Sequence, residues 1–368
     1  MSGGIALSPR DVAEQLGDRS YSLVPKLLPG GIYAQGRRAW RVGSLAGEPG
    51  GALRVYLDGP RRGRWRDYKS GQAGDLLDLV AAVACHGDTR AAYRWACDWL
   101  GVGRIEPAEA ERLRHRAEQA REVRRQEAER EAEGHARAAK GLWLAAAPLQ
   151  PGDAGWRYLA DRGINLGMLP APPAALRLHL GLWNPESQRH WPALVAAICG
   201  ADGRHVNTHR IWLDPQSNGQ VKKAPLAQPK LSMPGGYPGG AVRLWRGKSG
   251  RPWNAMPDGE TVLAGEGIED LLTIVSRRPE WRAVAVLSVS SLAPLVLPPA
   301  VARLIWIAQN DPPRSPAAKA LAAALALHRA AGRRVSVIRP PRLLKDVNDY
   351  AQALASHTIP HPAFGEAA

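Results

Sequence analysis

The chain has 368 residues with 45% hydrophobic content, enough to bury more than one core, and its length favours two or three domains. A formal charge of +15 favours a polyanionic partner, nucleic acid first and an anionic membrane surface second, although a genome rich in arginine codons would give the same charge. Three cysteines are too few for a disulfide framework, and no targeting signal or membrane-spanning run is recognised, so we expect a cytoplasmic protein.

The first segment, residues 1–104, predicts a small α+β domain. Ser8 followed by Pro9 is typical of a capped helix start, and residues 37–45 and 51–59 predict short strands. Cationic and aromatic side chains follow, and guanidinium groups beside planar rings suit single-stranded nucleic acid. The residues concerned are Arg61, Arg62, Arg64, Trp65 and Arg66. The alternative is that the tryptophans belong to a hairpin core and the arginines face water.

Residues 65–80 read WRDYKSGQAGDLLDLV, and this run resembles the second half of the zinc-binding domain at the front of bacterial and phage primases. That family places cysteine and histidine ligands just before the run. This chain has no cysteine before Cys85, and a tetrahedral zinc site needs about four Cys or His ligands. We therefore expect a degenerate zinc-binding-like domain that holds no zinc.

Residues 105–140 form a charged connector. Glu and Arg recur three or four positions apart, which supports an exposed helix, and Leu113 and Val123 are the only large aliphatic residues between Glu106 and Lys140. We expect a solvated helical spacer, with a contact between its arginines and nucleic acid left as an alternative.

The middle segment, residues 141–259, predicts a basic α+β region. Residues 155–183 resemble the segment that introduces the catalytic part of primases. Residues 193–199 and a return strand carrying His205, His209 and Arg210 predict a β-hairpin, in which we expect the two histidines to bond to backbone. A loop after the hairpin brings in Lys222, Lys223 and Lys230. With Arg210, these lysines are candidates to hold nucleotide phosphates or template backbone.

Residues 260–356 alternate short apolar runs with segments of helical period, which predicts an α/β fold with a parallel sheet and crossover helices. The expected strands are 261–265, 283–287, 304–308 and 335–338, and a helix is expected from Ile268. Polar groups follow three of the strands: Glu266, then Gln309-Asn310-Asp311, then Asp346 to Asp349. Ligands of open α/β sheets bind at this edge, so these carboxylates predict a site for a divalent metal.

These turns resemble the topoisomerase-primase (Toprim) domain in the form carried by primases of phages and other mobile elements. The family's E-G-x-x-D turn corresponds to residues 266–270, its D-x-D to 309–311, and its later acidic group to 345–349. The resemblance implies that Glu266 and Asp311 are catalytic. It also implies that Mg²⁺ or Mn²⁺ is held by Glu266, Asp311, Asp346, Asp349 and the amide of Gln309, with Lys345 near a phosphate. Residues 357–368 are a tail.

The implied activity is synthesis of short RNA primers from ribonucleotides on single-stranded DNA, in the replication of phage, plasmid or other mobile DNA. The chain has no G-x-x-x-x-G-K-[ST] motif, so a separate replicative helicase is the expected partner. Gln309 stands where the family has its first Asp, which removes one negative charge. The alternative is therefore a non-catalytic nucleic-acid-binding accessory protein. A Toprim nuclease or topoisomerase is less favoured, because no tyrosine lies in a recognisable strand-passage context.

Overall fold

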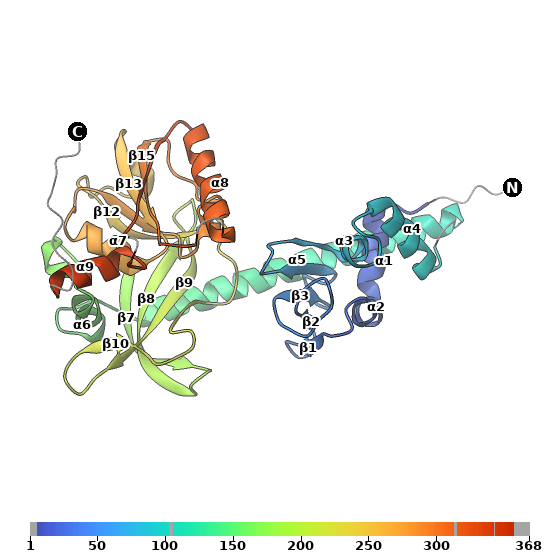
Figure 1. The fold of residues 1–368 in the computed structure, drawn as a ribbon, viewed down its shortest axis with the longest axis horizontal. Coiled ribbons are helices and arrows are strands. Elements are labelled where there is room, and N and C mark those ends of the chain that lie inside the picture. Colours follow the sequence, from blue (N-terminus) through green and yellow to red (C-terminus); the bar gives the residue numbers. More distant parts are fainter. Residues whose placement is uncertain (1–5, 103–105, 313–314, 342, 357–368) are drawn as a thin grey trace. The chain divides into compact units, whose positions relative to one another are not determined.

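The computed structural model describes residues 6–102, 106–312, 315–341 and 343–356 (Figure 1). The chain divides into two compact units, Met1–Ala132 and Glu133–Ala368. The division into four segments and a tail that the sequence suggests stays a prediction.

The first unit combines a five-stranded antiparallel sheet with helices. Its strands follow one another in chain order and are β1 (Ile32–Ala34), β2 (Ala39–Val42), β3 (Leu53–Tyr56), β4 (Arg64–Asp67) and β5 (Ala73–Asp75). Its helices are α1 (Pro9–Asp18), α2 (Ser20–Leu27), α3 (Leu76–Ala84) and α4 (Thr89–Leu100). The Ser8 hydroxyl accepts from the Asp11 amide, so the predicted cap of α1 is confirmed. The predicted strands at 37–45 and 51–59 are confirmed as β2 and β3.

Helix α5 (Pro107–Ala145) confirms the helical connector, but its first part is not a solvated spacer. Ala110 and Ala117 are buried, and Leu113 packs against the core of the first unit. Arg121 pairs with Asp11 of α1 at 3.3 Å, and Arg124 pairs with Glu14. Small alanines make this contact, so a search for large aliphatic residues alone could not find it.

The second unit is built on an eleven-stranded mixed sheet. Its main order is β10-β9-β8-β12-β14-β13-β15-β16, with β7 beside β8, β6 beside β7 and β11 beside β9. The first seven strands are β6 (Ala147–Pro148), β7 (Leu176–Asn184), β8 (Arg189–Cys199), β9 (His205–Pro215), β10 (Val221–Lys223), β11 (Lys230–Ser232) and β12 (Ala241–Arg246). The antiparallel pairing of β8 with β9 confirms the predicted hairpin.

The remaining strands, β14 (Arg282–Ala285), β13 (Glu260–Gly265), β15 (Val301–Ile307) and β16 (Arg334–Ile338), are parallel to one another. Each overlaps a strand predicted from the sequence, and α7 (Ile268–Val275) begins where a helix was expected. The predicted α/β class is thereby confirmed.

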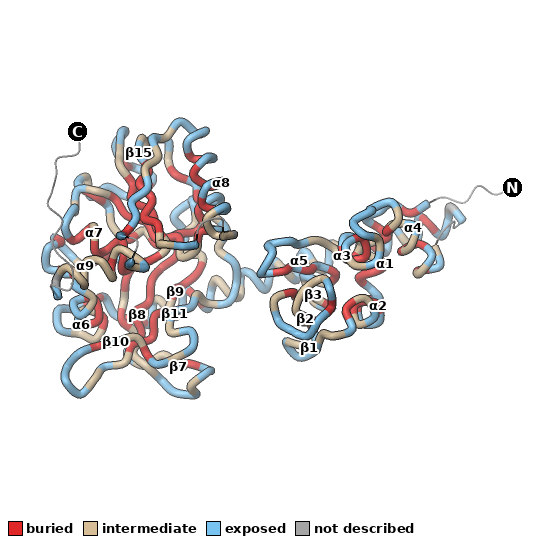
Figure 2. The backbone as a smooth tube through the Cα atoms, in the orientation of Figure 1, coloured by how far each residue is buried: buried red, intermediate tan, exposed pale blue. Residues whose placement is uncertain are grey.

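Helices cover both faces of the parallel strands. One core contains Leu263 and Ile305 with Leu271 of α7, and Val347 of α9 (Val347–Ala355) packs against it. The other core contains Leu304 with Leu321 of α8 (Pro316–Ala330). Helix α6 (Ala154–Asp161) and three short 3-10 turns, Leu166–Met168, Trp253–Ala255 and Val289–Ser291, complete the unit. Figure 2 shows the buried residues gathered along these strands and helices.

The lysine-rich segment is not a simple loop. Lys222 and Lys223 lie on β10, and Lys230 begins β11; both strands pair antiparallel with β9. Each strand has three residues, too few for an alternating pattern to stand out in the sequence. Across the described ranges, no helix is both long enough and apolar enough to span a membrane.

Candidate active site at the carboxyl edge of the parallel sheet

Glu266 follows β13 directly, and Gly267 caps the start of α7. A Cβ atom at Gly267 would clash with the Asp270 carboxylate, so a larger residue here would require that side chain to move. The Glu266 carboxylate is half-buried and accepts the Val289 amide at 3.1 Å. This geometry holds Glu266 at the end of the strand.

The acidic groups approach one another in two pairs. Burial raises the pKa of Glu266, and the negative charge of Asp311 raises it further, while Lys230 acts in the opposite direction. Burial also raises the pKa of Asp270 to about 6, with Asp346 as the next cause. Asp311 is exposed. Glu266 after β13 is therefore close to Asp311 after β15, and Asp270 of α7 is close to Asp346 after β16.

Asn310, between Gln309 and Asp311, joins two of these turns. Its side-chain amide donates to the carbonyls of Pro341 at 2.9 Å and Leu344 at 2.7 Å, and its backbone amide donates to Lys345 at 3.0 Å. Asn310 therefore fixes the turn that carries Asp311 against the turn that leads to Asp346.

Asn348 is a site-shaping residue to which sequence reasoning gave no role. It is fully buried, its backbone amide donates to Asp270 at 3.0 Å, and its side-chain amide donates to Thr273 Oγ1 and Arg162 O, each at 2.8 Å. Its place in the K-D-x-N-D motif was the only available sign. Through these hydrogen bonds, Asn348 connects the start of α9 to α7 and to the end of α6.

The same turn of α9 carries the last two acids. Asp346 caps the helix by accepting the Asp349 amide at 2.8 Å, and Asp349 lies 3.6 Å from Arg162. Asp346 therefore combines a structural role with its place beside Asp270.

Lys223 neutralises a buried acid instead of standing free for a phosphate. Its ammonium lies 2.8 Å from Glu269 Oε1, which also accepts the Tyr158 hydroxyl at 2.8 Å. Burial would raise the pKa of Glu269, but Lys223 lowers it to about 2. Lys223 and Tyr158 therefore both stabilise the charged form of Glu269.

Lys230 borders a cavity of about 270 Å³ next to the rim. The cavity is also lined by His209, Ser232, Tyr237, Glu266 and Glu269. His209 Nδ1 lies 3.1 Å from the Ser232 hydroxyl, and burial lowers its pKa to about 4, so the ring is neutral. His205 likewise meets a hydroxyl, Thr208, at 2.9 Å, which corrects the expectation of backbone partners.

The other predicted phosphate-binding cations differ in exposure and in their hydrogen bonds. Lys222 and Lys345 are exposed. Arg210 donates to the carbonyls of Leu231 at 3.3 Å and Ser232 at 3.0 Å and stacks over Trp212. Arg210 therefore holds β11 against β9, whereas Lys222 and Lys345 form no ion pair with any residue that the structure describes.

The rim has the donors that a magnesium ion uses. Mg²⁺ prefers carboxylate oxygens and keeps several waters, so it needs few protein ligands. Within the described ranges, no three acidic, histidine or cysteine side chains converge as a ready-made metal cluster. The two repelling pairs nevertheless fit a divalent cation, because its charge would relieve the repulsion that raises the pKa of Glu266 and Asp270. Gln309 is partly buried, and its backbone carbonyl accepts from the Arg339 guanidinium at 3.1 Å.

Trp65 is not available for stacking on a base. It is 5% exposed, and its indole N–H donates to the Asp75 carbonyl at 2.9 Å. The alternative interpretation, a tryptophan of the hairpin core, is therefore the correct one.

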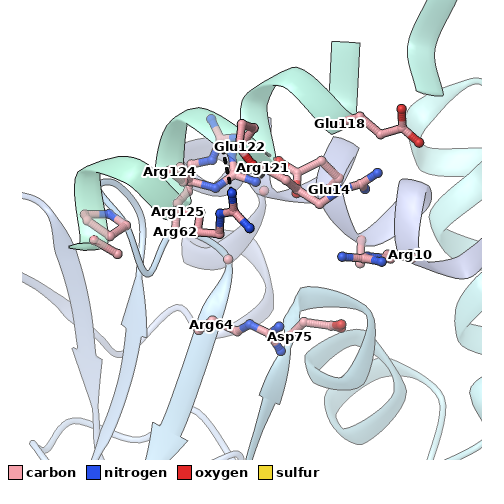
Figure 3. A pocket seen from close by; sticks show the side chains of 15 residues that line it. Arg10, Glu14, Arg62, Arg64, Asp75, Glu118, Arg121, Glu122, Arg124 and Arg125 are labelled. Carbon is pink, nitrogen blue, oxygen red and sulfur yellow. Dashed lines mark hydrogen bonds and ion pairs between the residues drawn. The ribbon is translucent and has the colours of Figure 1, made fainter. Parts of the chain in front are cut away.

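Arg62 is held by ion pairs, with Glu14 at 3.0 Å and with Asp18. Figure 3 shows Arg62, Arg121 and Arg124 gathered beside Glu14 in a hollow of about 550 Å³.

The outer face of the front sheet carries a row of arginines. Arg41, Arg54 and Arg66 stand directly opposite one another on β2, β3 and β4. No ion pair reaches any of the three from the described part of the chain, and the buried Nε atoms of Arg41 and Arg54 have no hydrogen-bond partner there. Tyr68, 57% exposed, has the Arg54 and Arg66 guanidiniums within 5.8 Å of its ring. Like charges directly opposite destabilise a sheet, so this row favours an anionic ligand.

Comparison with known families assigns the part of the chain that carries the rim. Residues 261–356 match the family described as Toprim domain, and residues 133–244 match a domain of unknown function, DUF7146. The carboxyl-terminal segment is therefore a Toprim domain, which confirms the predicted family for this segment. The correspondence of its three acidic turns and the phage or mobile-element type stay predictions. No match was found among curated proteins.

Solved structures of primases share a distant likeness with the chain. The zinc-binding and RNA polymerase domains of the Aquifex aeolicus primase are 12% identical, with a TM-score of 0.33 over 95% of this chain and 83% of that chain. A DNA primase domain from Pseudomonas aeruginosa is 15% identical, with a TM-score of 0.37 over 63% and 76%. The DnaG primase catalytic domain bound to single-stranded DNA is 16% identical, with a TM-score of 0.40 over 61% and 78%. The assignment rests on the Toprim match and the geometry of the rim.

Proposed function

We propose that the chain is a primase-like nucleotidyltransferase that joins ribonucleotides on a single-stranded DNA template with Mg²⁺ or Mn²⁺. The observation that carries the proposal is the convergence of Glu266 with Asp311 and of Asp270 with Asp346 at one edge of a Toprim sheet. Glu266, Asp311, Asp346 and Asp349 would hold the metal, with the Gln309 amide beside them. A bound divalent ion makes a hydroxyl more acidic and stabilises the leaving pyrophosphate.

The side chains of the rim have separate tasks in this proposal. Glu266, whose pKa is raised by burial and by Asp311, would accept the proton of the attacking hydroxyl. Lys230 borders the adjacent cavity and would neutralise a phosphate there, with Lys222 and Lys345 further out. Asn310 and Asn348 keep the acidic turns in register.

Template binding is assigned to the front sheet in the same proposal. Arg41, Arg54 and Arg66 would pair with successive phosphates, and Tyr68 offers a ring on which a base stacks. Arg61, which donates to the Tyr56 hydroxyl at 3.1 Å, and exposed Arg64 extend this surface. Replication of phage or other mobile DNA in the cytoplasm, with a separate helicase, is the proposed setting.

A primer-synthesis assay tests the proposal directly. The full chain is incubated with single-stranded template, labelled ribonucleotides and Mg²⁺ or Mn²⁺, and we expect short labelled oligonucleotides. Gln309→Asp restores the missing charge and should tighten metal binding by about 10–100-fold, which lowers the metal concentration needed for half-maximal synthesis. Absence of product from both the natural chain and Gln309→Asp, in either metal, would overturn the proposal.

A second candidate is a non-catalytic accessory protein that binds nucleic acid through the front sheet. Gln309 is the observation that favours it, because the rim then has one carboxylate fewer. Under this alternative, single-strand affinity is high, no product forms, and Gln309→Asp gives no gain. Fluorescence anisotropy with a labelled oligonucleotide, run beside the synthesis assay, separates the two candidates.

A further inference from the structure

A second hollow in the unit that begins at Glu133 lies away from the carboxylates. It has a volume of about 740 Å³ and is bordered by the last turn of α5, by β8 and β12, and by residues 247–254. Strand β12 pairs Val242 with Ala285 near the carboxyl edge of the parallel strands and Arg246 with Arg282 at their amino edge, and the hollow lies beside Arg246. Pockets of this size hold small molecules.

Tryptophan rings with fixed orientations line the hollow. The Trp143 indole N–H donates to the Ala175 carbonyl at 3.4 Å, and the Arg177 guanidinium stacks 3.7 Å from the ring centre. Trp253 is 8% exposed and lies under the Arg243 guanidinium at 5.2 Å. These contacts orient the rings before any ligand binds. Stacking of a flat ligand would therefore cost the protein little side-chain conformational entropy.

The hollow also has an excess of positive charge. Arg246 is exposed, and no ion pair to it is recorded from the described residues. Arg243 donates to the Gly200 and Ala201 carbonyls and has no carboxylate partner in the same part of the chain. Among the described acids, Asp202 alone lines the hollow, and it pairs with Arg204 at 3.5 Å. The surroundings therefore favour an anion beside an aromatic ring.

We propose that this hollow binds one nucleotide unit, with its base against Trp143 and its phosphate at Arg246. Every base has a flat face that stacks on an aromatic ring, and a guanidinium pairs with phosphate oxygens. The unit is either a free nucleotide or one residue of a single strand. The inference rests on the proposed function only for the class of ligand, since no carboxylate of the rim takes part.

Cys199 lines the same hollow and reports whether it is filled. The full chain is treated with N-ethylmaleimide in the presence of ATP without metal, or of an oligothymidylate of about ten nucleotides, a length within the usual site sizes for single strands. Peptide mass spectrometry then measures the alkylation of Cys199. We expect at least one ligand to slow it by about tenfold. Protection by ATP identifies a free nucleotide, and protection by the oligonucleotide alone identifies a strand.

Matched variants separate the hollow from the rest of the surface. Arg246→Ala should raise the ligand concentration for half protection by about tenfold, the effect of losing one charge-assisted contact. Lys248→Ala removes the same charge from an exposed position outside the hollow and should leave protection unchanged. Glu266→Gln should also leave protection intact, so failure of the proposed chemistry is distinguishable. Unchanged alkylation with both ligands, or equal effects of Arg246→Ala and Lys248→Ala, overturns the inference.

Discussion

The carboxyl edge of the Toprim sheet and the outer face of the front sheet both gather like charges, but they do so in opposite ways. At the edge, carboxylates meet in pairs, and nearby acids together with burial raise the pKa of Glu266 and Asp270. On the front sheet, Arg41, Arg54 and Arg66 stand in a row, and no ion pair from the described residues reaches them. A cation would relieve the repulsion in the first region, and a polyanion would relieve it in the second. The sign of the repelling charges therefore indicates the kind of ligand that each region would take.

Removal of the acid nearest the proposed chemistry should have the largest effect. Glu266→Gln should lower primer synthesis by about 10²–10⁴-fold, the range for loss of a proton-transferring group. Single-strand affinity should stay within about twofold, because the front sheet is untouched. Glu280→Gln, an exposed acid of the same unit, is the matched control. Equal synthesis by the natural chain and Glu266→Gln would remove Glu266 from the mechanism.

The lysine that neutralises Glu269 gives the next largest effect, on stability. Lys223→Met leaves a fully buried carboxylate without its cation and should cost about 3–5 kcal/mol of unfolding free energy in urea denaturation. Adding Glu269→Gln to this variant should recover most of the loss. Lys222→Met, exposed on the same strand, should change stability by less than about 0.5 kcal/mol. A similar loss from both lysine variants would contradict the buried pair.

The low pKa of Glu269 also predicts that the protein loses folding stability at acid pH. The pKa of Glu269 is about 2 in the folded chain against an ordinary value of 4.5, so its contribution is present above pH 4.5 and is lost as the pH falls towards 2. Glu269→Gln should flatten the loss of stability in that range, as measured by urea denaturation at successive pH values. An unchanged acid limb would contradict this assignment.

Asp270 should behave in the opposite sense. Its pKa of about 6 lies above the ordinary 3.8, so the folded chain holds the proton more tightly and loses stability as the pH rises from 3.8 to 6. Asp270→Asn keeps an acceptor for the Asn348 amide and should be about 1–3 kcal/mol more stable than the natural chain at pH 8. Asp258→Asn, at an exposed position, is the control. Lower stability of Asp270→Asn at pH 8 would show that Asp270 is not repelled by its neighbours.

Removal of one arginine from the front sheet should have the smallest effects. It should weaken single-strand binding but raise the stability of the first unit. Arg54→Gln should weaken single-strand binding by about tenfold and reduce its salt slope by about one. It should also stabilise the first unit by about 0.2–1 kcal/mol, because the middle charge of the row is gone. Arg38→Gln, which breaks an exposed pair with Asp58, should do neither. Weaker binding together with lower stability would indicate a structural arginine.

The sequence allowed the carboxyl-terminal sheet and its acidic rim to be predicted, because buried parallel strands are continuous apolar runs whose ends are marked by polar residues. Strands β10 and β11 were not predicted, because three residues are too few to show an alternating pattern. The packing of α5 was not predicted, because its buried contacts are made by alanines, which also favour exposed helices.

Individual side-chain roles were harder to predict. Trp65 and Arg66 are neighbours, yet one is buried and the other exposed, since successive residues of a strand face opposite sides. Arg54 joins the arginine row only through strand register, and Asn348 shapes the site only through contacts with distant segments. Such roles depend on pairing across the chain, which a single sequence does not display.

The position of α9 has a consequence for the integrity of the rim. Asp346, Asn348 and Asp349 all belong to the start of this one short helix, and Asn348 joins it to α7 and to the end of α6. Loss of α9 would therefore remove part of the acidic rim and leave the arginine row of the first unit in place. Under the proposed function, a chain without α9 would bind template, make no primer and inhibit the intact chain.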